Sequence, residues 1–207
     1  MREDVARSLR KSASDFSEIV WQRLGKRVGG GRIIVSEMIA LDGSLLSKQD
    51  LESGVDAWQL LGNSMGMRGI ASRVQWGESY KTFTIRYRLR SGNPTEWQKR
   101  LIAITHDRDG LLYPAITVQA YLNGKTLLDA AAVRTPDLYR WAIPRVRDAE
   151  KRGICNPPRF MSNDGDGNLF VVVKWSELLQ NDPPIELAMV SGDMLFDDGD
   201  ISPELSP

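Results

Sequence analysis

The sequence contains little cysteine, little histidine and no long apolar run. One Cys and one His stand among 207 residues. A single Cys excludes an internal disulfide framework and a Cys-based metal site, and a single His excludes a multi-His metal centre. No apolar stretch approaches the roughly 20 residues that cross a bilayer, and the N-terminus lacks the apolar core of a signal peptide. We therefore expect a soluble protein without metal or other cofactor in a reducing compartment, either cytoplasmic or, if the protein is viral, in the virion.

The charges balance overall but are unevenly distributed. Residues 1–32 contain eight Lys or Arg against four acids, and residues 33–176 contain nineteen against fifteen. Residues 177–207 contain eight acids and no Lys or Arg. An acidic tail on a basic body is typical of a solubilising segment, or of a segment that folds back and competes with an anionic partner.

Residues 3–24 have the periodicity of an amphipathic helix. The apolar positions, separated by three or four residues, are Val5, Leu9, Ala13, Phe16, Val20 and Leu24. Three glycines at 29–31 follow and predict a flexible hinge. The pattern divides the chain into a basic arm with its hinge over 1–31, one domain over 32–190 and an acidic tail over 191–207. The apolar stripe must pack on the body of the chain, on a partner, or on a second copy in a homo-oligomer.

The pattern over the rest of the chain predicts an α+β fold with a mostly antiparallel sheet, two or three flanking helices, the N-terminal helical arm and a disordered acidic C-terminal tail. Asn123-Gly124 is a strong hairpin signal, and Pro144 predicts either a kink in its helix or two short helices. We expect helices at 3–24, 47–61 and 136–152, and strands at 32–40, 80–90, 100–105, 115–122, 125–133, 169–175 and 185–190.

The segment 80–90 has the clearest strand periodicity. Arg86, Arg88 and Arg90 alternate with Phe83, Ile85, Tyr87 and Leu89. Alternate residues of a strand are about 6–7 Å apart, which is near the spacing of phosphates along a nucleic acid strand. Residues 68–100 hold eight Lys or Arg against two acids, whereas a solvated sheet face would interleave both signs. Arginine is nevertheless also an ordinary residue on the exposed face of an antiparallel sheet.

These features favour a non-enzymatic binding protein for an anionic polymer or surface. Nucleic acid, DNA or RNA, is the expected partner, and the single-stranded form is favoured because aromatic side chains beside the basic strand could stack bases. A self-assembling coat- or matrix-type structural protein of a virus or phage would combine the same basic arm, β-rich body and self-association. The candidate binding residues are Arg86, Arg88, Arg90, Lys99, Arg100, Trp76, Tyr80 and Trp97.

Asp107 and Asp109 support an alternative function. Two carboxylates beside the only His, between predicted strands, could hold Mg²⁺ in a nuclease or phosphoesterase. Asp and Gly are, however, common turn residues for local reasons. No Glu-x-Lys motif follows on the next predicted strand. The metal-dependent enzyme therefore remains the alternative, and no catalytic or metal-binding residue is assigned.

Overall fold

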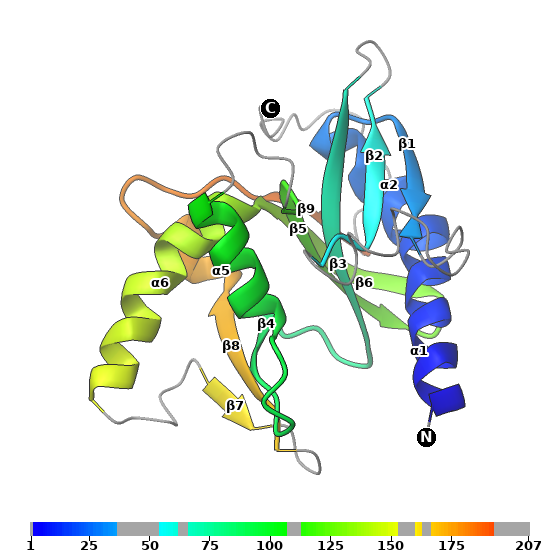
Figure 1. The fold of residues 1–207 in the computed structure, drawn as a ribbon. Coiled ribbons are helices and arrows are strands. Elements are labelled where there is room, and N and C mark those ends of the chain that lie inside the picture. The colour runs from blue at the N-terminus through cyan, green and yellow to red at the C-terminus, as the bar shows by residue number, and fades with distance from the viewer. Residues whose placement is uncertain are drawn as a thin grey trace.

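The computed structural model of the chain describes residues 2–36, 54–61, 66–106, 113–152, 160–162 and 167–192. These residues form an α+β fold built on two mostly antiparallel sheets (Figure 1). The N-terminal helical segment is α1 (Arg2–Asp15), the π-helical η1 (Phe16–Val20), α2 (Trp21–Leu24) and the 3₁₀-helical η2 (Gly25–Val28). The later helices are α5 (Glu96–His106), α6 (Thr135–Lys151) and α7 (Trp175–Leu179).

Sheet A has six strands and sheet B has three. The order in sheet A is β1-β2-β3-β5-β6-β9, in which only β3 and β5 are parallel, and the order in sheet B is β4-β8-β7. The strands of sheet A are β1 (Arg32–Val35), β2 (Ala57–Leu60), β3 (Met67–Trp76), β5 (Ile116–Asn123), β6 (Thr126–Arg134) and β9 (Ala188–Ser191). Those of sheet B are β4 (Thr82–Arg88), β7 (Phe160–Ser162) and β8 (Leu169–Lys174).

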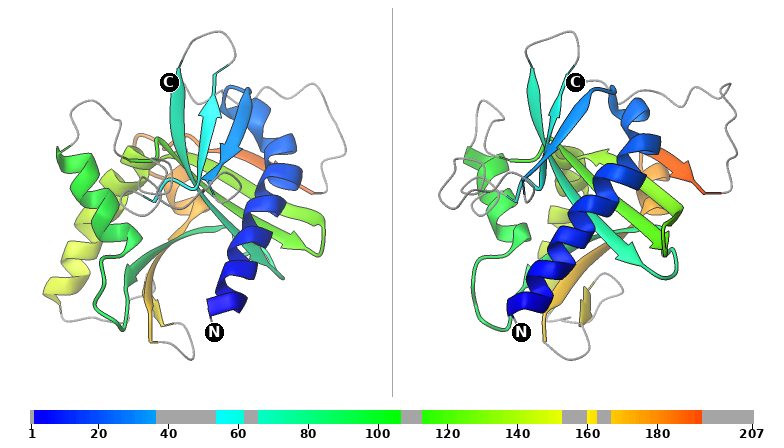
Figure 2. Two further views of the ribbon diagram at one scale, coloured as in Figure 1. Left: turned by 45° about the vertical axis from the view of Figure 1, so that its right-hand side comes forward. Right: turned by 90° about the vertical axis from the view of Figure 1, so that its right-hand side faces the viewer.

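The N-terminal helical segment crosses one face of sheet A (Figure 2). Phe16, Val20, Leu24 and Val28 are each 0% exposed and pack with apolar side chains of the strands beneath. Burying four such side chains stabilises the fold by roughly 6–12 kcal/mol. The predicted amphipathic helix is confirmed, and its apolar stripe packs on the body of its own chain from Ala13 onward, whereas Leu9 is 52% exposed.

The other face of sheet A carries a second core. Sheet B, α5 and α6 contribute the side chains that pack there against β5 and β6. Phe83 and Ile85 of β4 are both 0% exposed in this core, so the predicted alternation along the 80–90 strand is confirmed at these two positions. Sheet A thus lies between a helical layer and a layer of sheet B with two helices.

The glycines at 29–31 form a turn with defined contacts. All three have positive φ, and a Cβ on Gly31 would lie 2.1 Å from the backbone oxygen of Leu60. The side-chain amide of Gln59 donates to the carbonyl oxygen of Val28 at 2.9 Å. The turn is therefore tied to β2. That residues 1–31 are separable from the rest stays a prediction, and the packing of the helix argues for the opposite outcome.

The helix predicted over 47–61 is wrong where the structure describes the chain. Residues 57–60 form β2, and residues 47–53 lie outside the described residues. Both faces of β2 are covered, since the consecutive residues Trp58 and Gln59, whose side chains point to opposite faces, are 6% and 0% exposed. A strand buried on both faces has no alternation to distinguish it from a short helix.

The strand predicted over 100–105 is also wrong, because these residues belong to α5. The helix begins with a capping box that the strand prediction overlooked. The backbone N–H of Thr95 donates to Gln98 Oε1 at 3.0 Å, and the backbone N–H of Gln98 donates to Thr95 Oγ1 at 3.5 Å. Trp97 and Leu101, one turn apart, then face the second core.

The remaining predicted elements are confirmed with shifted ends. The predicted 185–190 strand is reduced to β9, and the 32–40 strand is described only as β1. The β5–β6 hairpin closes at Asn123 and Thr126 around Gly124, whose φ is +61°. Pro144 lies inside the single helix α6, so the alternative of two short helices is wrong, and a kink stays a prediction. Of the predicted tail, Ser191 belongs to β9 and residues 193–207 lie outside the described residues.

No helix in the described part of the chain is both long enough and apolar enough to cross a membrane.

Candidate binding cleft

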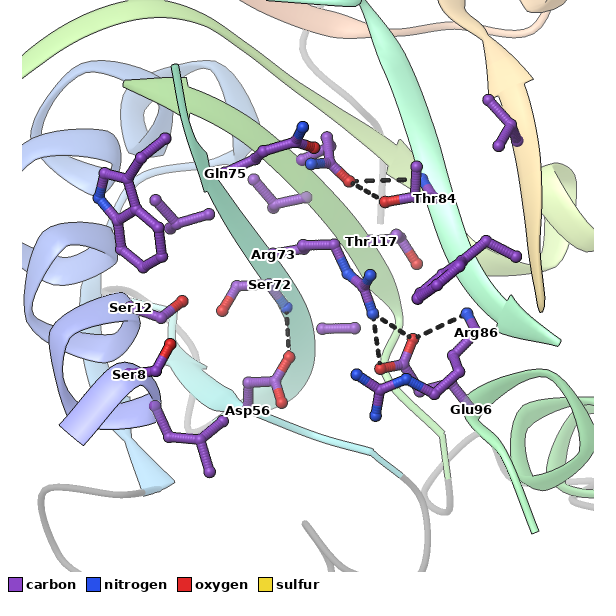
Figure 3. A pocket seen from close by; sticks show the side chains of 18 of the residues that line it. Ser8, Ser12, Asp56, Ser72, Arg73, Gln75, Thr84, Arg86, Glu96 and Thr117 are labelled. Atoms are coloured by element: carbon purple, nitrogen blue, oxygen red, sulfur yellow. Dashed lines mark hydrogen bonds and ion pairs between the residues drawn. The ribbon is translucent and has the colours of Figure 1, made fainter. Parts of the chain in front are cut away.

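A cleft of about 720 Å³ runs along β3, between the N-terminal helix and sheet B (Figure 3). Its floor comes from β3 and β5, one wall comes from α1, and the other comes from β4, β8 and α5. The charged side chains that line it are Asp56, Arg73, Arg86, Glu96 and Arg100. Most of its other lining atoms belong to hydroxyl, amide and small apolar side chains, so the cleft is suited to a polar ligand.

The cleft exists because β3 extends beyond β2. β2 pairs only with residues 67–70, whereas β5 pairs with the rest of β3 on the opposite side. Asp56 ends the ladder, because its N–H donates to the Ile70 carbonyl at 2.9 Å and its carboxylate accepts the Ser72 N–H at 2.6 Å. Over residues 71–76, β5 is therefore the only neighbouring strand within the described part of the chain, and the other edge of β3 faces the cleft.

Glu96, the first residue of α5, lies among three arginines (Figure 3). Its two carboxylate oxygens accept hydrogen bonds from Arg73 Nη2 at 3.0 and 3.3 Å, and Oε2 accepts the backbone N–H of Arg86 at 3.4 Å. Burial by itself would raise the pKa of Glu96, but the charges of Arg73, Arg100 and Arg86 lower that pKa to about 2. The carboxylate is therefore ionised throughout the physiological range.

Arg100 lies deeper and is 4% exposed. Its Nη2 donates to the carbonyl oxygen of Gly54 at 3.4 Å. Burial by itself would lower the pKa of the guanidinium, but Tyr139, Glu96 and Asp56 raise it above the ordinary value for arginine. A positive charge is thus fixed at the base of the cleft.

The cleft has more N–H donors than its own acceptors satisfy. Nε of Arg86, Nε of Arg100 and Nε2 of Gln119 are buried without a hydrogen-bond partner in the described part of the structure. The orientation of Gln119 is fixed, because its Oε1 accepts the backbone N–H of Thr84 at 3.3 Å and the Thr84 hydroxyl at 3.0 Å. Buried donors without partners destabilise a fold, so this lining favours oxygen acceptors brought by a ligand or by water.

The structure separates the basic residues that the sequence grouped. Arg86 and Arg100 line the cleft, Lys99 is half-buried, and Arg88 and Arg90 are exposed. A register shift between Arg86 and Arg88 in the β4–β8 pairing divides the arginines of β4. Neither Arg88 nor Arg90 forms an ion pair among the described residues. The predicted single arginine face is therefore one arginine inside the cleft and two on the surface.

The three aromatic candidates lie in different environments. Trp97 is 5% exposed and stacks on Tyr139 with ring centroids 4.9 Å apart, so it belongs to the second core. Trp76 is half-buried, and Lys11 Nζ lies 3.6 Å from the centre of its ring. Tyr80 is 59% exposed. Of the three, Tyr80 presents the ring surface that a base could stack on.

Arg73 and Gln119 are site residues that the sequence prediction missed. They are register partners in the parallel β3–β5 pair, and their side chains line the cleft together. No local sequence pattern indicates that these two residues lie together, because their contact depends on a crossover between segments far apart in the chain. Glu96 had a local signal, the Thr95–Gln98 capping box that places an acid at the first position of a helix.

A second carboxylate cluster lies on the side of the N-terminal helix. The side chain of Asp15 is 0% exposed and accepts hydrogen bonds from Lys125 Nζ at 2.6 Å, Trp76 Nε1 at 2.9 Å and Lys11 Nζ at 3.2 Å. Burial by itself would raise the pKa of Asp15, but these three bonds lower it. The carboxylate joins the helix to the end of β3 and to the β5–β6 hairpin.

The residues proposed for the alternative, enzymatic function are not described. Asp107 and Asp109 lie outside the described residues. Among the residues that are described, no group of three or more His, Cys, Asp or Glu side chains lies close enough to hold a metal ion. Within the cleft, Glu96 is engaged by arginine and Asp56 by the Ser72 N–H.

Comparison of the chain with protein-family models, curated proteins and solved structures finds no match. The chemistry of the cleft is then the observation from which a function can be argued. That chemistry consists of three arginines around one carboxylate, with unpartnered N–H groups beside them.

Proposed function

We propose that the protein is a non-enzymatic binding protein for nucleic acid, and that it binds a single strand with phosphate groups held by the arginines in and beside the cleft. The observation that carries the proposal is the excess of arginine over acid in the cleft: Arg73, Arg86 and Arg100 lie around Glu96, and the other acid in the lining, Asp56, accepts the Ser72 N–H. Guanidinium groups bind phosphate through planar, charge-assisted hydrogen bonds. An incoming phosphate could satisfy donors that Glu96 leaves over.

The exposed arginines extend this site along β4. Arg88 follows Arg86 toward the end of β4, and Arg90 follows in the turn after it. The register shift after Arg86 leaves Arg88 and Arg90 on the surface, so a strand whose phosphate is held at Arg86 could continue to these two arginines. Arg88 and Arg90 are free of ion pairs within the described residues and so lose little by binding phosphate.

The dimensions of the cleft support a single strand over a duplex. A volume of about 720 Å³ is in the usual range for a pocket that encloses a small ligand. It has room for a phosphate with an unstacked nucleotide, whereas a duplex exposes its phosphates only on a wide outer surface. The exposed Tyr80 supplies an aromatic surface at the other end of β4.

A salt titration tests the proposal. The affinity of the full chain for a fluorescein-labelled single-stranded oligonucleotide of about 15 nucleotides is measured by anisotropy between about 50 and 300 mM salt. We expect Arg86→Ala/Arg88→Ala/Arg90→Ala to lower the slope of log affinity against log salt by roughly two to three, about one for each lost phosphate contact.

The matched control removes three exposed cations of α6, in Arg140→Ala/Arg147→Ala/Lys151→Ala. Its salt slope should equal that of the unmodified chain. An unchanged slope in the β4 variant would exclude the proposed site. An equal decrease of the slope in both variants would exclude it as well, because it would indicate nonspecific attraction to the whole basic surface.

A further inference from the structure

β3 changes from an interior strand to an edge strand within its own length. Residues 67–70 have strand neighbours on both sides, whereas residues 71–76 have a strand neighbour only on the β5 side among the described residues. The five consecutive residues 72–76 all line the cleft, although the side chains of a strand alternate between the two faces of its sheet. It is therefore the backbone at the edge of β3 that faces the cleft.

Ser72 fixes the direction of the unpaired backbone groups. Its N–H points away from β5, because it donates to the carboxylate of Asp56 at 2.6 Å. Alternate residues of a strand point their N–H and C=O groups to the same side, so those of Val74 and Trp76 face the cleft as well. No backbone hydrogen bond on that side joins Val74 or Trp76 to another described residue. The edge thus presents acceptors and donors in alternation.

The open row is short for a further strand and suits smaller ligands. Asp56 occupies the Ser72 N–H at one end, and β3 itself ends at Trp76. Two acceptor–donor pairs lie between these ends: the Ser72 C=O with the Val74 N–H, and the Val74 C=O with the Trp76 N–H. The Watson–Crick edge of every nucleobase carries a donor beside an acceptor, so such a pair can bind a base. These edges are free in a single strand.

The two walls beside this edge offer surfaces for the faces of a base. On the α1 side the cleft is lined by Leu9, which is 52% exposed although it belongs to the apolar stripe of its helix. On the sheet B side it is lined by Phe170, and the guanidinium of Arg73 lies 5.3 Å from the centre of the Phe170 ring. A base bonded to the β3 edge would lie between these two walls and bury the exposed leucine.

The phosphate site lies within reach of the same nucleotide. Arg73 leaves the β3 backbone between Ser72 and Val74, and its Nη2 reaches the carboxylate of Glu96 at 3.0 Å (Figure 3). A base at the edge and a phosphate at the guanidinium of Arg73 are therefore about one arginine side chain apart, which is comparable to the span from base to phosphate in a nucleotide. One unpaired nucleotide can fill both places.

We propose that the open edge of β3 binds the Watson–Crick edge of an unpaired base through the main chain of residues 72–76, with Leu9 against one face of the base. The inference rests on the proposed function and names the ligand at its site, an unpaired nucleotide. Adenine and cytosine present an amino donor beside a ring acceptor, whereas guanine, thymine and uracil present a ring donor beside a carbonyl. The alternating edge accepts both orders, so binding tolerates sequence, and a duplex is rejected because its Watson–Crick edges are already paired.

Oligonucleotides of equal length and altered bases test the contact with the full chain. In N3-methylthymine a methyl group replaces the N–H donor of the Watson–Crick edge, whereas deoxyuridine lacks only the C5 methyl group and keeps that edge. We expect an N3-methylthymine strand to bind about tenfold more weakly than oligothymidine, with the same salt slope, because its phosphates are unchanged. The deoxyuridine strand is the control and should bind like oligothymidine. Equal affinities for the N3-methylthymine and thymine strands would overturn the base contact and leave phosphate binding intact.

Two leucine variants test the wall on the α1 side. Leu9→Ala should weaken the binding of oligothymidine by about threefold to tenfold, because it removes apolar surface that the base would cover. Leu179→Ala removes a leucine of α7 that is 41% exposed and lies outside the cleft lining, and it should bind like the unmodified chain. Equal affinities of the Leu9→Ala variant and the unmodified chain would overturn the placement of the base.

Amide spectra of the isotope-labelled full chain separate this inference from the proposed function. Uridine at millimolar concentration carries a base and no phosphate, and it should shift the amide resonances of Val74 and Trp76, whereas N3-methyluridine should not. Shifts with uridine but no binding of any oligonucleotide would leave the base site standing while the proposed function fails. No shift with uridine would overturn the base site. Shifts with a peptide of alternating glutamate and valine, and none with uridine, would overturn it in favour of a protein partner.

Discussion

Two carboxylates, Asp15 and Glu96, each hold cations on opposite sides of the cleft, and they do so differently. Asp15 is 0% exposed and its oxygens take three donors, two of them from the largely exposed lysines Lys11 and Lys125. Glu96 is 28% exposed and is surrounded by arginines, of which Arg86 and Arg100 retain a buried N–H without a partner in the described structure.

The difference lies in which partner is in excess. Around Asp15, all three described donors are bonded to the carboxylate, and the two lysines among them are also open to water. This cluster is therefore complete and joins the elements that it contacts. Around Glu96, donors outnumber acceptors, and the remaining N–H groups line the wall of a cleft. The comparison teaches that charge balance within a cluster, rather than burial alone, separates a structural ion pair from a candidate binding site.

The largest effect should come from removing the helix that carries Asp15. Deletion of residues 1–28 removes the four fully buried side chains of the first core, worth roughly 6–12 kcal/mol, which is comparable to the whole stability of a domain. We expect residues 29–207 to show no cooperative thermal transition by circular dichroism. The hinge predicted from the glycines implies the opposite, a thermal transition that survives the deletion, and that result would restore the separable arm.

Replacing Asp15 itself should have a smaller effect. Asp15→Ala leaves the indole N–H of Trp76 without its acceptor, and losing a hydrogen bond to a charged group costs about 1.5–3 kcal/mol, whereas the largely exposed Lys11 and Lys125 are left to water. Denaturant unfolding of Asp15→Ala measures the loss. Glu18→Ala, which removes an exposed acid of the same helix, is the control and should change the stability by less than about 0.5 kcal/mol. Equal effects would show that Asp15 is not a joint.

The contribution of Glu96 to the free energy of unfolding should depend on pH. Its pKa is about 2 in the folded chain against an ordinary value of 4.5, so its stabilising contribution is complete above pH 4.5 and is lost as the pH falls toward 2. The difference corresponds to about 3 kcal/mol. We expect Glu96→Gln to be less stable than the unmodified chain at pH 7 and to approach its stability near pH 2. Denaturant unfolding at several pH values checks this, and a constant gap between the two proteins would contradict it.

The exposed arginines should have the smallest effect on stability. Arg88 and Arg90 form no ion pair in the described structure, so Arg88→Ala/Arg90→Ala should shift the unfolding free energy by less than about 0.5 kcal/mol. Arg100→Ala, which empties a buried position beside Glu96, provides the contrast and should destabilise measurably. A large loss in the exposed pair would mean that these arginines support the fold instead of remaining available to a ligand.

Local patterns predicted much of the fold. Alternation placed Phe83 and Ile85 in a core, and Asn123-Gly124 located the β5–β6 hairpin. The errors over 57–60 and 100–105 have local causes, since a strand covered on both faces loses its periodicity and a capping box was overlooked. The tertiary arrangement then decided which side chains reach the cleft.

The candidate site was only partly predictable. Arg86 and Arg100 were recognised from the density of positive charge, and both line the cleft. Arg73 and Gln119 meet only because β3 and β5 pair in parallel after an intervening strand and helix, and such non-local contacts leave no periodic signal. Trp97 was assigned to the surface by its basic neighbours, whereas the helical period of α5 places it in the core.

The central claim is that a phosphate can join Glu96 among the arginines of the cleft. The affinity of the Glu96→Gln variant for the single-stranded oligonucleotide tests this claim most directly. Measured at one moderate salt concentration on protein shown to be folded by its thermal transition, the affinity should rise by about threefold to tenfold, because the substitution removes a competing negative charge and keeps the side-chain shape. An unchanged or lower affinity in the folded variant would contradict the account.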